Sequence, residues 1–236
     1  MATHEVANRF AHTSAIYPGA INRLTPQVTA NFLDRRQPKG YQKVSPLTFL
    51  MNDKAQKRRE RLIRSAARRI HRHGYERTSL ADIAKGARVP VGGVYYYFKS
   101  KEDLIYATVE MRLNELEERL TAWNALPSAK IRLKALINVW RDDSEVDARY
   151  GCPIGSLCYE LAKAGGAVAK AAGRPLERIC EWSAVQFREQ GLPNPDGLAE
   201  HLTMALQGAS LLANALRDPE ALVRETDRLK NWIKDL

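Results

Sequence analysis

From Lys54 to the end of the chain, apolar residues recur with the period of an α-helix, and this feature constrains the fold most. The first such segment carries an apolar stripe made of Leu62, Ile63, Ala66, Ala67 and Ile70. No segment shows the strict alternation of apolar and polar residues that is typical of a half-buried strand. The sequence therefore predicts an all-α protein.

Helix caps divide the first part of this pattern. Ser79–Asp82 and Ser100–Asp103 both fit a capping box, in which a serine and an acidic side chain satisfy each other's backbone N–H groups. The first box opens a short helix that ends near Gly86, and the second opens a long helix. Pro90 suits the first turn of a helix between them, because its missing N–H has no partner there. That helix is expected to end near Phe98.

Glycines and prolines punctuate the rest of the chain. Pro175 lies within one of the later segments, where it should kink the helix or delay its start. The expected later helices cover about 128–148, 154–164, 167–190, 196–217 and 219–235.

The positive charge is concentrated in one fifth of the chain. Between Asp53 and Lys101 there are fourteen Lys or Arg residues against four acidic ones, whereas residues 102–236 hold 17 basic and 21 acidic residues. A local excess of this size favours an anionic partner such as nucleic acid.

Three parts are predicted. Residues 1–50 contain four prolines and no helical or strand period, so a disordered N-terminal extension is expected. Residues 51–101 form a helix-turn-helix domain, and residues 102–236 form a helical domain for signal binding and dimerisation. Met51 is an alternative start of translation. The extension could instead be an arm that reaches into a DNA groove through Arg35, Arg36 and Lys39.

Two short helices joined by a tight turn are typical of a helix-turn-helix, here over 79–98. The stretch TSLADIAKGARVPVGGVYYYFKSKEDL, Thr78 to Leu104, resembles the DNA-binding domain of the tetracycline-repressor (TetR) family of bacterial regulators. The matching features are the T-S-x-x-x-I-A entry, the turn, G-x-x-Y-x-x-F and K-x-K-x-x-L.

The resemblance implies that the helix after Pro90 lies in the major groove. Glycines early in it would let the backbone approach the duplex, tyrosines would contact phosphates or bases, and Thr78, Lys99 and Lys101 would contact phosphates. Tyr95 is expected in the core instead. The full set of expected DNA-contacting residues is Thr78, Ser79, Pro90, Val91, Gly92, Gly93, Tyr96, Tyr97, Lys99 and Lys101. The inward faces should be formed by Leu80, Ile83, Ala84, Val89, Val94 and Phe98.

Two residues depart from the family pattern. Arg88 stands where a turn glycine is usual, so a left-handed conformation there would cost about 1 kcal/mol. Val91 replaces a frequently polar or basic residue, so one typical contact with DNA is expected to be apolar here.

The region after residue 102 resembles the family only in being a helical domain for ligand binding and dimerisation, although Gly151–Ala162 resembles a segment of one TetR subgroup. The last two helices carry apolar faces that could pair with their two-fold mates. Aromatic residues at helical spacing can line a cavity or simply fill the core. The candidates for a ligand cavity are Trp123, Trp140, Tyr150, Tyr159, Trp182 and Phe187.

The function that follows is a repressor that binds a palindromic operator as a homodimer and is released by a small-molecule effector. One alternative is a redox or electrophile sensor that uses Cys152, for which a buried, inert thiol is the competing interpretation. A structural DNA binder is another. An enzyme would need a catalytic set built around Cys152, Cys158 or Glu160, and no such set is apparent.

No cofactor or metal site is expected. Three cysteines are too few for a disulfide framework, and no apolar run is long enough to span a membrane, so a cytoplasmic protein is predicted.

Overall fold

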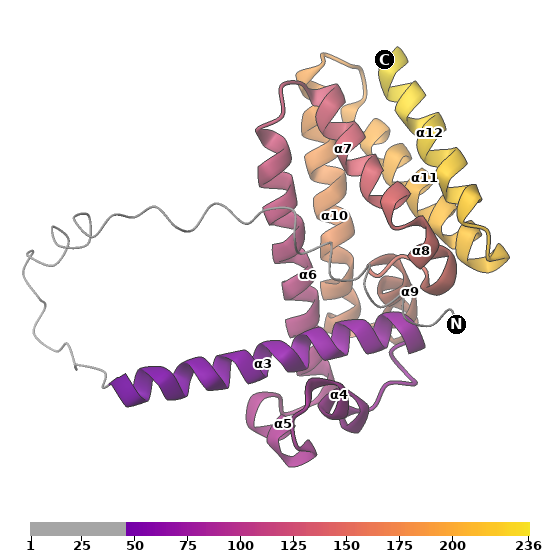
Figure 1. The fold of residues 1–236 in the computed structure, drawn as a ribbon. Coiled ribbons are helices and arrows are strands. Elements are labelled where there is room, and N and C mark those ends of the chain that lie inside the picture. Colours follow the sequence, from indigo (N-terminus) through magenta and orange to yellow (C-terminus); the bar gives the residue numbers. More distant parts are fainter. Residues whose placement is uncertain (1–45) are drawn as a thin grey trace, which may run out of the picture. The chain divides into compact units, whose positions relative to one another are not determined.

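The computed structural model describes residues 46–236, and all regular structure in this range is helical (Figure 1). The all-α prediction is therefore confirmed. Most of the predicted extension, residues 1–45, lies outside the described residues. The helices are α3 (Pro46–His73), α4 (Leu80–Ala87), α5 (Val91–Tyr97), α6 (Lys101–Asn124), α7 (Ala129–Asp142), α8 (Ser144–Tyr150), α9 (Gly155–Ala164), α10 (Gly166–Glu189), α11 (Pro195–Leu216) and α12 (Pro219–Asp235).

Helices α3, α4 and α5 follow one another as the helix-turn-helix pattern predicts, although α3 starts at Pro46, inside the range assigned to the extension. Both capping boxes are present, with Ser79 opening α4 and Ser100 opening α6. The Ser65 hydroxyl on α3 donates to the Ile83 carbonyl on α4 over 2.8 Å. A Cβ on Gly86 would lie 2.4 Å from the Ser65 oxygen, so this close approach of α3 and α4 requires a glycine.

The helix predicted over 128–148 is wrong, because the chain breaks at Asp143 into α7 and α8. Asp143 has φ −94° and ψ 8°, outside the helical region, and it ends one helix while preceding the next. Asp and Ser side chains compete for backbone hydrogen bonds, which makes the Asp142–Ser144 stretch a weak point for a helix. Pro175, in contrast, is buried inside α10 and does not delay its start.

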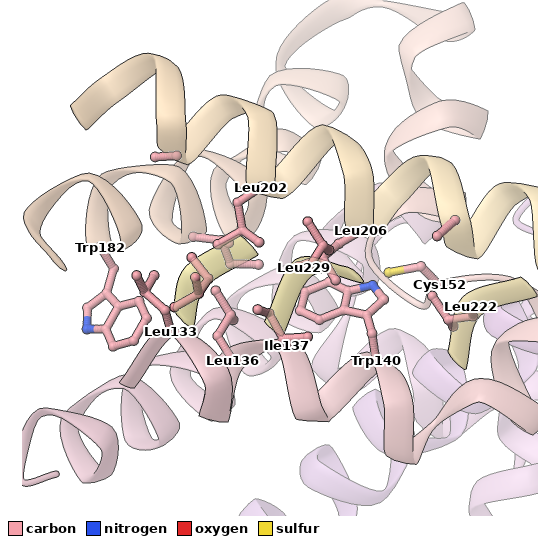
Figure 2. Close-up of a cluster of buried hydrophobic side chains, with 14 of the residues drawn as sticks. Leu133, Leu136, Ile137, Trp140, Cys152, Trp182, Leu202, Leu206, Leu222 and Leu229 are labelled. Carbon is pink, nitrogen blue, oxygen red and sulfur yellow. The ribbon is translucent and has the colours of Figure 1, made fainter. Parts of the chain in front are cut away.

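Two apolar cores hold these helices together. The larger one joins α6, α7, α10, α11 and α12, and Figure 2 shows part of it. The second core lies around α3, α4, α5 and the start of α6, and it contains five of the six predicted inward residues, with Leu80 partly buried against it. This second core also includes Leu157, Leu161 and Ala172 from α9 and α10. The helix-turn-helix is thus packed directly onto the helical body.

Candidate functional site

Helix α5 presents aromatic side chains to solvent. Val94 and Phe98 are buried four residues apart, which fixes the inward face of the helix. On the outward side, Tyr96 is 76% exposed, Tyr95 50% and Val91 47%. Large apolar side chains that remain this exposed on a short helix are typical of a binding surface.

The expectation that Tyr95 packs in the core is wrong. Tyr97 is the tyrosine that packs partly against the core, because it stands three residues after Val94 and beside Phe98. Its ring makes an edge contact with the Tyr96 ring at 4.9 Å between centroids. The exposed pair is therefore Tyr95 and Tyr96. The helical spacing of Val94 and Phe98 was the signal that could have identified it.

The start of α5 leaves room for a partner to come close. A Cβ on Gly92 would meet no atom within 4 Å, and one on Gly93 would touch only Val89, at 3.3 Å. Pro90 is exposed and precedes the helix as its N-cap, one position earlier than predicted. Internal packing therefore does not require a glycine at 92, and the surface there is open to a partner.

The expected phosphate-contacting residues differ in exposure. Thr78 is only 2% exposed and its hydroxyl donates to the Gly74 carbonyl, so the expectation that its side chain contacts a phosphate is wrong. Ser79 is exposed but is engaged in the cap of α4. The Lys99 ammonium is exposed and donates to the Tyr95 carbonyl.

Lys101 has a structural task that the sequence did not reveal. Its ammonium donates to the Tyr75 carbonyl at 2.6 Å and lies 3.9 Å from the centroid of the Tyr75 ring. Such a cation–π contact holds the start of α6 against the turn after α3.

Arg88, in the turn between α4 and α5, adopts the left-handed conformation, with φ 56° and ψ 47°. We expect Arg88→Gly to raise the free energy of unfolding by about 1 kcal/mol, because glycine pays no Cβ penalty there. Urea denaturation measures the change. Arg88→Ala is the control, since alanine keeps the strain while removing the charge. An equal gain in both variants would contradict the explanation.

A cavity of about 120 Å³ lies within the helical body, where a single water would need only about 10–15 Å³. Of the six aromatic residues predicted for such a cavity, Trp123 and Trp140 line it. The other lining residues are Arg112, Glu115, Leu116, Arg119, Leu136, Val139, Asp143, Asp147, Cys152, Pro153, Ile154 and Ile179.

The other four aromatic residues lie elsewhere, so their assignment to this cavity is corrected. Trp182 and Phe187 are buried in the core, and the Trp182 indole donates to Asn124 over 2.8 Å. Tyr159 is 68% exposed, because the neighbouring buried positions of α9 turn it outward. Tyr150 is half-buried against the ring of His71.

Cys152 reaches the cavity wall, but its surroundings oppose thiolate formation. Burial, followed by the negative charge of Asp147, raises the pKa of the Cys152 thiol, and burial raises that of Cys158 to about 11. A reactive cysteine needs the opposite, a lowered pKa and access to solvent. These observations favour the buried, inert interpretation over a redox sensor.

Two hydrogen bonds connect the end of α3 with the body. His71 Nε2 lies 2.7 Å from the Gly151 carbonyl oxygen, and the Tyr75 N–H donates to the Glu160 carboxylate at 2.5 Å. Gly151 directly precedes Cys152, Pro153 and Ile154, which line the cavity. One loop thus touches both the cavity and the helix-turn-helix.

Comparison with known proteins identifies this architecture. Residues 62–108 match the family model for bacterial regulatory proteins of the tetR family, and residues 129–227 match the model described as transcriptional regulator LmrA/YxaF-like, C-terminal domain. The transcriptional regulator AcuR from Cereibacter sphaeroides is 30% identical over 178 residues, covering 68% of this chain and 78% of that protein. The chain belongs to the TetR family.

Further relatives of this TetR-family regulator support the same assignment. An uncharacterized HTH-type transcriptional regulator from Lactococcus lactis subsp. lactis is 27% identical over 184 residues, covering 73% of this chain and 91% of that one. The crystal structure of the regulatory protein TetR from Rhodobacter sphaeroides superposes with a TM-score of 0.65 at 26% identity, covering 73% and 96% of the two chains. The protein is a DNA-binding transcriptional regulator, not an enzyme.

Within residues 46–236 of this TetR-family regulator, no helix is long and apolar enough to cross a membrane. The side chains described there also include no group of three His, Cys, Asp or Glu residues that could hold a metal ion.

Proposed function

We propose that this regulator is a repressor that binds a palindromic operator as a homodimer and leaves it when a small molecule occupies the cavity. The observation that carries this proposal is the exposed face of α5, where Tyr95 and Tyr96 stand beside Gly92. Tyrosine can offer a hydroxyl to a phosphate or base and an aromatic edge to a thymine methyl. Val91 adds an apolar contact.

Dimerisation is supported by the outward face of α11. Met204 and Leu211 are 64% and 71% exposed, and Gly208 and Ala215 continue the same stripe at helical spacing. Val185 on α10 is also half exposed. Two copies of α10 and α11 would bury these side chains in a four-helix interface.

Helix α12, which the sequence assigned to the interface, has no free apolar face. Its apolar residues Leu222, Leu229 and Ile233 are at most 3% exposed and belong to the core of their own chain. That part of the prediction is wrong, because the face packs within the protomer.

Release by an effector is supported by the loop at Gly151. A molecule in the cavity would press on Cys152 and Pro153. The hydrogen bond that the Gly151 carbonyl accepts from His71 would carry the displacement to α3. The recognition helices of a dimer must meet groove faces about 34–36 Å apart, so a small shift removes contacts on one half-site. A hundredfold loss of affinity for DNA corresponds to about 2.7 kcal/mol of coupling free energy. By linkage, bound DNA must lower the affinity for the effector by the same factor.

We expect Tyr96→Ala to weaken operator binding by about 1–3 kcal/mol, or roughly five- to 150-fold, because it removes the most exposed side chain of α5. A gel shift with the operator selected from random DNA measures the change. Tyr159→Ala is the matched control, since it removes an exposed tyrosine from α9 instead. Unchanged affinity for Tyr96→Ala would exclude α5 as the recognition helix.

A further inference from the structure

The cavity has two buried polar groups that lack a full complement of partners. Trp140 is 7% exposed, and its indole Nε1–H has no hydrogen-bond acceptor. Figure 2 shows this nitrogen turned toward the end of the cluster where Cys152 lies. Buried N–H groups nearly always have a partner, so an unpaired donor on a residue that lines the cavity indicates a site for an acceptor atom.

The second group is the Asp147 carboxylate, which is 2% exposed. It accepts a hydrogen bond from the Ser210 hydroxyl at 2.5 Å, and no cationic side chain forms an ion pair with it among the described residues. Burial raises the pKa of Asp147 to about 6, so near neutral pH it is largely an uncompensated negative charge. Burying such a charge is costly unless a cation accompanies it.

The two arginines that line the cavity do not supply this cation. Arg112 pairs with Glu115 at 3.4 Å. Arg119 is exposed, and its positive charge acts on Asp143, whose pKa it lowers against a larger effect of burial. Asp147 feels Asp143 as a second negative charge instead. The part of the cavity that Asp143 and Asp147 line is therefore anionic.

The geometry points to a protonated amine as the effector class: an ammonium group at Asp147, an oxygen acceptor for the Trp140 N–H, and an apolar body between Trp123 and Trp140. Indole faces attract cations, which adds to the attraction of the carboxylate. Leu136 and Ile179 supply apolar wall for the body of the ligand. The ligand class follows from the cavity alone. That the bound ligand regulates DNA binding rests on the proposed function.

Three probes that share one phenyl ring and one benzylic hydroxyl test the assignment: 2-amino-1-phenylethanol, 1-phenylethane-1,2-diol and mandelate. They differ only in carrying a cation, a neutral group or an anion. We expect calorimetry with the full chain at pH 7.4 to show the amine binding at about 1 mM or tighter, and at least about tenfold tighter than the diol. Mandelate should bind more weakly than the amine.

Asp147→Asn separates the charge from the shape of the site, because the amide can still accept from Ser210. It should abolish the preference for the amine and leave diol binding nearly unchanged. The melting temperature should rise, because the variant removes a buried negative charge that lacks a cation. Asp235→Asn, at an exposed position near the end of α12, is the control for loss of a negative charge. Trp140→Phe should weaken the binding of all three probes, because each carries the benzylic oxygen.

Equal affinity for amine and diol, tightest binding of mandelate, or amine binding weaker than about 10 mM would each overturn the assignment. A gel shift with the amine present is scored separately. If the amine binds with the expected preference but leaves the operator complex intact, the ligand class stands and the proposed release mechanism fails.

Discussion

Replacing Met204 and Leu211 together by glutamate is expected to dissociate the proposed dimer and to weaken operator binding by about 10²–10⁴-fold, because the two half-sites are then no longer bound by one linked particle. Each carboxylate would lie in an apolar interface, where burying an unpaired charge is far more costly than losing one contact. Both side chains are more than 60% exposed in the single chain, so the protomer should remain folded.

Analytical ultracentrifugation gives the mass of the variant, and a gel shift gives its affinity for the operator. A control with the same added charge is Asn114→Glu combined with Asn231→Glu, at exposed positions on α6 and α12. This control should stay dimeric. A dimeric Met204/Leu211 variant would show that the exposed face of α11 has another role.

The second large effect is a loss of stability when Phe187 is replaced. The sequence predicted that this residue lines the cavity. Its side chain is fully buried, its ring centroid lies 5.8 Å from that of Trp232, and it does not line the cavity. Phe187→Ala should therefore lower the free energy of unfolding by about 3–5 kcal/mol. Cavity ligands should bind the variant with unchanged affinity at temperatures where it is folded.

Urea denaturation at a fixed protein concentration measures this loss, since the stability of the proposed dimer would depend on concentration. Ile131→Ala on α7 is the control for apolar volume, because Ile131 is 45% exposed and lies outside both the cavity and the proposed interface. A loss of less than about 1 kcal/mol for Phe187→Ala would mean that the core around Trp232 is less tightly packed than described.

Local signals were sufficient for the elements around the DNA-binding helices. The two capping boxes, at Ser79 and Ser100, are completed by residues three positions away, so sequence spacing alone determines them. Arg88 could be identified as a strained position because it stands where the family pattern has a turn glycine. These features depend on contacts within a few residues.

Features that depend on distant contacts were not predictable in the same way. An aromatic residue at helical spacing can face a cavity or a core, and only the packing of α6, α7 and α10 separates Trp140 from Phe187. In the sequence, the apolar face of α12 has the same pattern whether α7 or a second chain covers it. The Tyr95 error had a different cause, since the family pattern was followed where the spacing of Val94 and Phe98 pointed the other way.

The shared core beneath the DNA-binding helices has a consequence for building hybrid regulators. Leu157 and Leu161 on α9 and Ala172 on α10 fill the same core as the residues of α3, α4 and α5. A chimera joined at Lys101 would therefore take one part of this core from one protein and the remaining part from another. The side chains of the two parts would then not be matched to each other. A working chimera with another family member has to exchange these body residues together with the helix-turn-helix, so the exchangeable unit is defined by packing and not by a continuous stretch of chain.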